Sequence, residues 1–159
     1  FFRQERWGRN GKTFKVLKFR TMKTSAGEEM ARAEDERVTR LGRLLRAMGL
    51  DELPQLVNIL KGEMSFVGPR PLAIDEKLQG GRQVQYEDLA GFETRLSVRP
   101  GLTSLATIYI SKDTDPTRKF RYDTLYVRKR SLGLDLKLIA LSYWISFSGR
   151  WERRQSKLK

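Results

Sequence analysis

The sequence predicts a single α+β domain that is mostly helical and that carries a short β-hairpin and a few small strands. The turn sequence Asn10-Gly11 precedes a segment of alternating apolar residues, which is typical of a hairpin. In later segments the apolar residues recur at helical spacing. A length of 159 residues with 39% hydrophobic content suits one compact unit with a modest core.

The composition is strongly basic. The chain has 32 Lys and Arg residues against 19 Asp and Glu residues, a formal net charge of +13. This charge points to a polyanionic partner, which is nucleic acid, anionic lipid or a phosphorylated substrate. Because the chain has no cysteine and no histidine, disulfides, zinc–thiolate sites, thiol nucleophiles and the usual general base are excluded. Chemistry therefore falls to carboxylates, lysines, hydroxyls or a hard metal ion.

The hairpin is expected to place basic side chains together. Residues 7–12 form its turn, and residues 15–22 form its second strand. Side chains alternate along a strand, so Lys18 and Arg20 share one face, which suits phosphate binding. A charged edge strand without a ligand is the alternative interpretation. Residues 24–35 are polar and predict a mobile loop or a short exposed helix.

A tight corner between two helices is the central feature of the sequence. The first helix, over residues 38–48, is amphipathic and ends at Gly49. Asp51 is expected to cap the second helix, which has Pro54 in its first turn and ends near residues 61–62. The buried face of this second helix is expected to consist of Leu53, Leu56, Val57 and Leu60.

Asp51 and Glu52 are the predicted reactive centre. Two adjacent carboxylates repel each other, which makes it costly to ionise both unless cations or a metal offset them. Arg46 lies one helical turn and a short link before Asp51, where it can hold an anion that approaches the corner. A purely structural capping role for Asp51 is the alternative.

Two further arginines lie beside prolines. A short strand over residues 63–67 leads into Pro69-Arg70-Pro71, where the prolines restrict the backbone on both sides of Arg70. A restrained arginine loses less entropy on binding phosphate, although a structural turn explains the motif equally well. Arg99 precedes Pro100 in a second turn.

The C-terminal half predicts mainly helices. We expect two short helices over residues 75–96, a buried strand over residues 105–110 and a helix from Pro116 with Asp123 in its middle. The last helix, residues 132–147, packs in the core or lies along a membrane surface, and a basic tail follows. No apolar run has the roughly 20 residues that cross a bilayer. The chain starts at Phe1 without a methionine, so we expect that a preceding segment was removed or not included.

Four motifs, in this order and spacing, closely resemble the bacterial sugar transferase family, the monotopic phosphoglycosyl transferases. The resemblance extends from Phe1 to about Phe147. The motifs are Lys18-Phe19-Arg20-Thr21-Met22, Asp51-Glu52-Leu53-Pro54-Gln55, Ser65-Phe66-Val67-Gly68-Pro69-Arg70-Pro71 and Arg99-Pro100-Gly101-Leu102-Thr103.

The resemblance implies an enzyme that moves a sugar phosphate from a nucleoside diphosphate sugar, usually a UDP-sugar, to a membrane polyprenol phosphate. It implies that Asp51 is the nucleophile of a covalent phosphoglycosyl aspartate, and that Glu52 completes the catalytic pair. Magnesium (Mg²⁺) is the expected cofactor, held by Asp51 and Glu52. Asp123 is a candidate donor-binding residue. The residues expected to hold phosphates are Lys18, Arg20, Arg46, Arg70 and Arg99.

The resemblance also implies a location. Family members carry a re-entrant membrane helix just before the segment that matches Phe1, so we expect that helix to be absent from this chain. We therefore expect a membrane-associated, monotopic protein on the cytoplasmic face of the inner membrane, with residues 1–149 as the catalytic domain and residues 150–159 as a basic tail. An anionic membrane surface is an expected partner, and a homodimer is left open.

Two alternatives and one departure accompany this interpretation. Residues 104–111 lack the tryptophan and arginine that the family commonly has there, so the nucleotide or sugar preference is not predicted. A basic nucleic-acid-binding module would explain the charge and the two helices that meet at a turn, but not Glu52 beside Asp51. A scaffold that keeps the fold without the activity is the other alternative.

Overall fold

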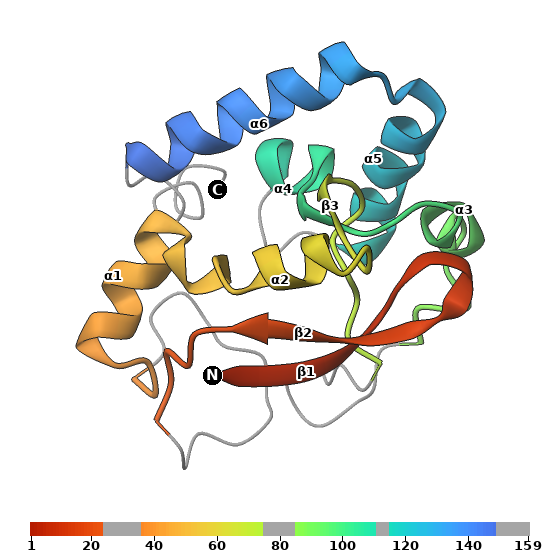
Figure 1. Cartoon of the computed structure of the whole chain (residues 1–159). Coiled ribbons are helices and arrows are strands. Elements are labelled where there is room, and N and C mark those ends of the chain that lie inside the picture. The colour runs from red at the N-terminus through yellow and green to blue at the C-terminus, as the bar shows by residue number, and fades with distance from the viewer. Residues whose placement is uncertain (24–35, 75–84, 111–114, 149–159) are drawn as a thin grey trace.

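The computed structural model describes residues 1–23, 36–74, 85–110 and 115–148 of the chain. It confirms a mixed helix and strand fold in which helices predominate (Figure 1). Within these ranges, none of the helices combines the length and the apolar character that crossing a bilayer requires. The predicted loop at residues 24–35 and the basic tail at residues 150–159 lie outside the described residues.

The N-terminal hairpin forms as the sequence predicts. Strand β1 (Phe2–Trp7) pairs antiparallel with β2 (Thr13–Lys18), and Phe2 lies opposite Lys18. Asn10 and Gly11 have φ values of 57° and 74°, the left-handed conformations that short hairpin turns favour. Because β2 ends at Lys18, the alternation expected to bring Arg20 to the same face does not extend that far.

A second, parallel pair of strands brings two proline-containing turns together. Strand β3 (Ser65–Val67) pairs with β4 (Gly101–Thr103). Their ends approach so closely that a Cβ atom on Gly101 would lie 2.1 Å from the backbone nitrogen of Gly68. Only glycine fits at this position, and the Pro69-Arg70-Pro71 turn is thereby packed against the turn before β4.

The prediction of a strand over residues 105–110 is wrong. Residues Leu105–Tyr109 form helix α4, whose N-cap Ser104 accepts a hydrogen bond from the backbone nitrogen of Thr107 at 2.9 Å. A short apolar run fits a buried strand and a buried helix equally well, and here the cap decides between them.

The central corner contains an additional short helix. Helix α1 (Arg40–Met48) ends at Gly49, which has a φ of 69° as predicted. The 3₁₀ turn η2 (Leu50–Glu52) follows, and α2 (Gln55–Leu60) begins only after Pro54. The prediction that Asp51 caps this helix is wrong, because Asp51 lies within the 3₁₀ turn and no side chain caps α2.

Helix α2 also presents the face opposite to the predicted one. Leu60 is 87% exposed, whereas Gln55 and Asn58 are 2% and 1% exposed. The Asn58 side chain donates to the Lys15 carbonyl at 2.9 Å and accepts from the Leu17 backbone nitrogen at 3.2 Å. Polar contacts therefore attach α2 to β2, and its leucines point outward.

The remaining helices are α3 (Phe92–Leu96), α5 (Pro116–Lys129) and α6 (Leu132–Phe147). Helices α5 and α6 pack in a core cluster with Val67 of β3, and α3 packs against α5 in a second cluster. Helix α5 begins at Pro116 as predicted. Of the two short helices expected over residues 75–96, α3 is described, and residues 75–84 lie outside the described ranges.

One face of helix α6 packs in the core, and its expected position along a membrane surface stays a prediction. Leu138 and Ile145 are buried in a cluster with Val67 of β3. On other faces of the helix, Trp144 is 68% exposed and Phe147 is 88% exposed. One face of α6 therefore belongs to the core, and other apolar side chains of the same helix remain uncovered.

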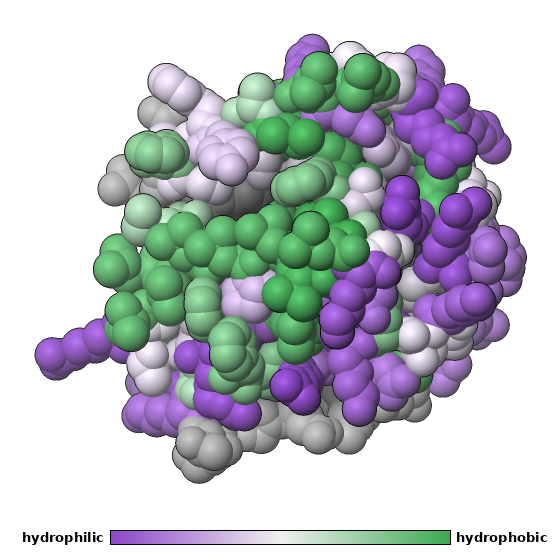
Figure 2. Space-filling model, in the orientation of Figure 1, coloured by the Kyte–Doolittle hydropathy of each residue, from purple (hydrophilic) through white to green (hydrophobic). Residues whose placement is uncertain are grey.

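Exposed apolar side chains also gather over α1 and α2 (Figure 2). We call this surface the α1–α2 apolar face. Clustered exposed apolar side chains are typical of surfaces that contact a membrane or another molecule. Its exposed residues are Leu41, Leu44, Met48, Leu53, Leu56, Val57 and Leu60.

Candidate functional site

The predicted reactive pair lies where α1, α2 and the end of β2 meet (Figure 1). Asp51 and Glu52 belong to η2, between the two helices. The backbone nitrogen of Phe19 donates to the Asp51 carbonyl at 2.9 Å, which joins the chain just after β2 to this turn. The site is therefore built from two segments more than 30 residues apart in sequence.

Two cations hold the Glu52 carboxylate. Lys18 Nζ lies 2.8 Å from Glu52 Oε1. The Arg70 guanidinium bonds to both oxygens, through Nη2 to Oε1 and through Nη1 to Oε2 at 3.4 Å. Burial alone would raise the pKa of Glu52, but Arg70 and Lys18 outweigh it and hold the pKa well below its usual range. Glu52 therefore stays ionised, with both of its oxygens engaged.

The Asp51 carboxylate is in the opposite situation. Among the described residues, none donates a side-chain or backbone hydrogen bond to it or forms an ion pair with it. Burial raises the pKa of Asp51, and the charge of Glu52 raises it further, while Lys18, Arg70 and Arg46 oppose the rise. An unbonded carboxylate with a raised pKa is more basic than an engaged one, which suits attack on phosphorus or binding of a metal.

The structure brings together five of the predicted site residues. Arg46 Nε donates to Thr21 Oγ1 at 2.8 Å, which orients the arginine, and its charge acts on Asp51. Burial lowers the pKa of Lys18, and the charge of Glu52 opposes this. The gathered residues are Lys18, Arg46, Asp51, Glu52 and Arg70.

The contacts described above at the corner do not include the other three predicted residues. Arg20 and Arg99 are exposed. Arg99 Nη1 is 4.0 Å from the position of a Cβ on Gly62, past the far end of α2 from Asp51. Phosphate binding by these two arginines stays a prediction.

Asp123 is inside the protein. It is 2% exposed and lies 3.3 Å from Arg95 Nη2. Burial raises the pKa of Asp123 to about 6, and the charge of Arg95 opposes the rise. The structure does not bring this carboxylate to the corner, and its donor-binding role stays a prediction.

Sequence reasoning missed Gln55. Its side chain is buried, and in the described part of the chain its Nε2 atom has no hydrogen-bond partner. It lines a small cavity together with Arg6, Lys18 and Arg70. An unpartnered amide beside three cationic side chains suits an oxygen-rich ligand. The available signal was a glutamine four residues after Asp51, in a helix whose only other polar residue is Asn58.

The metal prediction can be compared with these contacts. The described residues contain no group of three or more acidic, histidine or cysteine side chains that could hold a metal ion. Mg²⁺ commonly takes one or two carboxylates and fills its remaining positions with water and substrate phosphates. Asp51 fits that role because its oxygens are not engaged. As a ligand, Glu52 would share its oxygens with Lys18 and Arg70.

Comparison with known proteins places this geometry in a family. The sequence model of the bacterial sugar transferases matches residues 1–149. A UDP-glucose:undecaprenyl-phosphate glucose-1-phosphate transferase of Klebsiella pneumoniae is 42% identical over 154 residues, which cover 92% of this chain and 32% of that protein. An undecaprenyl-phosphate glucose phosphotransferase of Komagataeibacter xylinus is 40% identical over 89% of this chain and 28% of its own length.

A shorter relative is matched over more of its length. The exopolysaccharide production protein PSS of Rhizobium leguminosarum bv. phaseoli is 40% identical, over 87% of this chain and 72% of its own length. The chain spans about a third of the length of the Klebsiella and Komagataeibacter proteins. Because the family match covers nearly the whole sequence, the chain belongs to the bacterial sugar transferase family.

Proposed function

We propose that this chain carries the catalytic centre of a polyprenyl-phosphate sugar-1-phosphate transferase. The donor is a nucleoside diphosphate sugar of the UDP class, and the acceptor is a membrane polyprenol phosphate. Relatives named for undecaprenyl phosphate support the acceptor. The observation that carries the proposal is the Asp51 carboxylate beside Glu52, Lys18 and Arg70, to which no residue of the described ranges donates a hydrogen bond.

In the first step, a carboxylate oxygen of Asp51 attacks the phosphorus that bears the sugar. The bond from this phosphorus to the bridging oxygen breaks, and the nucleoside monophosphate leaves with that oxygen. In the second step, a phosphate oxygen of the polyprenol phosphate attacks the same phosphorus and releases Asp51. The product is a polyprenyl diphosphate sugar, and no histidine or cysteine is needed.

The cations around Asp51 support this chemistry. Negative charge is transferred to the leaving phosphate during the first step, and arginine forks and a lysine ammonium can stabilise it. Glu52 holds Lys18 and Arg70 in place before the substrate arrives. A cation whose position is already fixed needs little reorganisation during the reaction.

Magnesium is part of the proposal. When bound, it would neutralise diphosphate charge and polarise the phosphoryl oxygens. Asp51 is the better placed ligand, and Glu52 remains the second predicted one. The cavity lined by Gln55, Arg6, Lys18 and Arg70 is suited to the oxygens of a phosphate group.

We propose further that the corner works at a membrane, on the cytoplasmic side of the inner membrane. The acceptor is a lipid phosphate, so the reacting carboxylate must reach the headgroup region. The α1–α2 apolar face belongs to the two helices that flank Asp51, and Leu60 in it is 87% exposed. Apolar side chains that enter the lipid surface would hold Asp51 at the height of the acceptor phosphate.

A nucleic-acid-binding role is less consistent with this surface. Protein faces that bind nucleic acid are polar and positively charged. Here two carboxylates and a group of exposed leucines occupy the corner where the two helices meet.

The decisive experiment replaces Asp51 by Asn. The variant keeps the size of the side chain and loses the nucleophile, so UMP release from a panel of UDP-sugars should be abolished in the full-length protein with Mg²⁺ and polyprenol phosphate. Arg118→Ala, an exposed change on α5, is the control and should keep wild-type activity. Near wild-type release by a purified Asn variant that is shown not to have deamidated would refute the proposal.

A further inference from the structure

The turn that carries Arg70 is held from two sides by backbone contacts. The Pro69 carbonyl accepts a hydrogen bond from the Gly101 nitrogen at 2.9 Å. The Leu72 carbonyl accepts one from the Trp7 nitrogen, also at 2.9 Å. These bonds attach the two ends of the turn to β4 and to β1.

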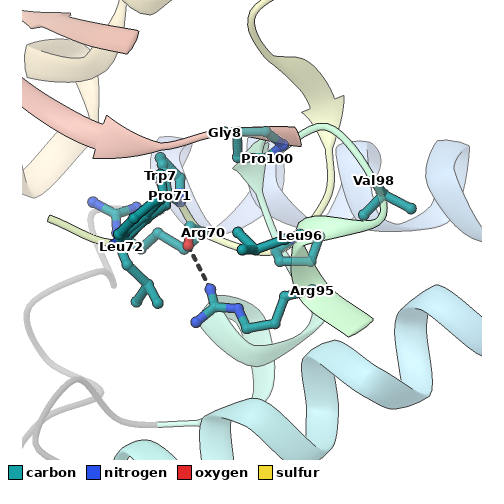
Figure 3. Close-up of a pocket in the computed structure, with 10 residues that line it drawn as sticks. Trp7, Gly8, Arg70, Pro71, Leu72, Arg95, Leu96, Val98 and Pro100 are labelled. Carbon is teal, nitrogen blue, oxygen red and sulfur yellow. Dashed lines mark hydrogen bonds between the residues drawn. The ribbon is translucent and has the colours of Figure 1, made fainter. Parts of the chain in front are cut away.

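The two carbonyls between them are held by arginine side chains. Arg6 Nη1 donates to the Pro71 carbonyl at 2.9 Å. Arg95 Nη2 donates to the Arg70 carbonyl at 2.6 Å (Figure 3). Because proline has no N–H, carbonyl oxygens are the main groups by which the backbone of a Pro-Arg-Pro turn can be held. At Arg70, the Arg95 guanidinium makes such a contact.

Arg95 itself is fixed inside the protein. It lies on α3 and is 4% exposed. Its Nη2 atom is 3.3 Å from Asp123 Oδ2, and its guanidinium carbon is 4.3 Å from the centre of the Phe120 ring. Both partners belong to α5. A buried arginine costs solvation free energy and often contributes little net stability even when paired, so a role in positioning is the more informative explanation.

We propose that Arg95 is a positioning residue for the transfer reaction: it holds the Arg70 backbone from the interior so that the Arg70 guanidinium meets Glu52 beside Asp51. The path runs from Asp123 through Arg95 to the Arg70 carbonyl, and from the Arg70 guanidinium to Glu52. Arg95 is buried and does not touch the substrate. This inference rests on the proposed function for its effect on turnover, but not for its effect on Arg70.

Two variants of the full-length protein remove the contact in different ways. Arg95→Lys keeps the charge but replaces the planar guanidinium, so the Nη2 atom that meets both the Arg70 carbonyl and Asp123 is lost. The double change Arg95→Met and Asp123→Leu replaces the ion pair by apolar side chains, an exchange that is often neutral for stability. In both variants, kcat/KM for the UDP-sugar should fall about 10-fold. A loss of this size is expected when a charge-assisted hydrogen bond that positions a group is removed.

A coupling measurement separates positioning from general damage. If Arg95 acts through Arg70, Arg95→Lys should change kcat/KM by less than about 2-fold in a protein that already carries Arg70→Ala. Ile145→Val is the control, because Ile145 is buried on α6, a helix that makes none of the hydrogen bonds described above for the turn. It should lower the melting temperature and leave kcat/KM unchanged. Equal losses from Arg95→Lys in both backgrounds would overturn the proposal.

A second measurement does not need turnover. In protein with ¹⁵N-labelled arginine, relaxation of the guanidinium N–H groups should show Arg70 as ordered in the wild type and more mobile in Arg95→Lys. Unchanged order of Arg70 would refute the positioning role, whatever the activity. If the wild type turns over no UDP-sugar but Arg70 loses order in the variant, the proposed function fails and the positioning of Arg70 by Arg95 stands.

Discussion

Lys18 Nζ lies 2.8 Å from Glu52 Oε1, so an ion pair joins the last residue of β2 to the turn that carries Asp51. Arg70 reaches the same carboxylate from the turn after β3. Glu52 is thus paired with two cations, whereas in the described part of the chain the Asp51 carboxylate has no such partner. Adjacent carboxylates in one turn therefore have different surroundings.

Glu52 should stabilise the fold in a pH-dependent way. Its folded-state pKa lies well below the ordinary value of 4.5, so its contribution is present above pH 4.5 and is lost as the pH falls further. Glu52→Gln should lower the free energy of unfolding by about 2 kcal/mol at pH 7, the cost of losing hydrogen bonds to charged groups. Urea unfolding of both proteins from pH 7 to pH 3 measures this difference. A difference that stays constant down to pH 3 would contradict it.

Asp123 should make the stability of the fold depend on pH in the opposite direction. Its folded-state pKa of about 6 lies above the ordinary 3.8, so between these values the folded protein binds more protons than the unfolded chain. This contribution to stability is full at low pH and is lost as the pH rises toward 6. Relative to Asp123→Asn, the wild type should gain up to about 3 kcal/mol between pH 7 and pH 4. If unfolding shows the same difference at both pH values, the carboxylate does not titrate in this range.

The arginines at the corner should matter more than those outside it. Arg70→Ala and Arg46→Ala should each lower kcat/KM by about 100-fold, because each removes a cation placed near the reacting carboxylate. Arg118→Ala should have no effect. Testing Arg20→Ala and Arg99→Ala in the same series would show whether the phosphate site extends beyond the gathered residues. Similar losses in all five variants would indicate general charge attraction in place of a defined site.

The α1–α2 apolar face should be required for membrane binding. Leu56→Glu together with Leu60→Glu adds charge to exposed positions, so stability should hardly change while sedimentation with anionic vesicles is lost. Leu125→Glu, at a position 42% exposed on α5, is the matched control and should leave sedimentation unchanged. Unchanged sedimentation of the α2 variant would remove this face from the membrane contact.

Local signals predicted most of the fold. Asn10-Gly11, Gly49 and Pro116 each dictate a backbone conformation through their own chemistry, and each lies where the sequence indicated a turn or a helix end. The predictions at Leu105–Tyr109 and in α2 were wrong for two other reasons. A short apolar run does not distinguish a buried strand from a buried helix, and periodicity finds an apolar face without saying whether protein or an outside medium covers it.

The candidate site was predicted only in part. Asp51, Glu52 and Arg70 lie in sequence motifs, and the structure brings them together. Arg95 could not be identified in the same way, because a buried arginine looks like a surface arginine until its hydrogen bond to the Arg70 carbonyl is seen. The contact joins two residues that are 25 positions apart in the sequence, and the local sequence pattern does not indicate it.

The Asn58 amide makes the position of α2 independent of what covers the outer face of the helix. It donates to the Lys15 carbonyl and to Glu63, and it accepts from the Leu17 nitrogen, so it fixes α2 against β2 through hydrogen bonds on the inner side of the helix. The outer leucines take no part in this attachment. The distance between Lys18 and Glu52 should therefore be the same whether lipid, detergent or water contacts the leucines.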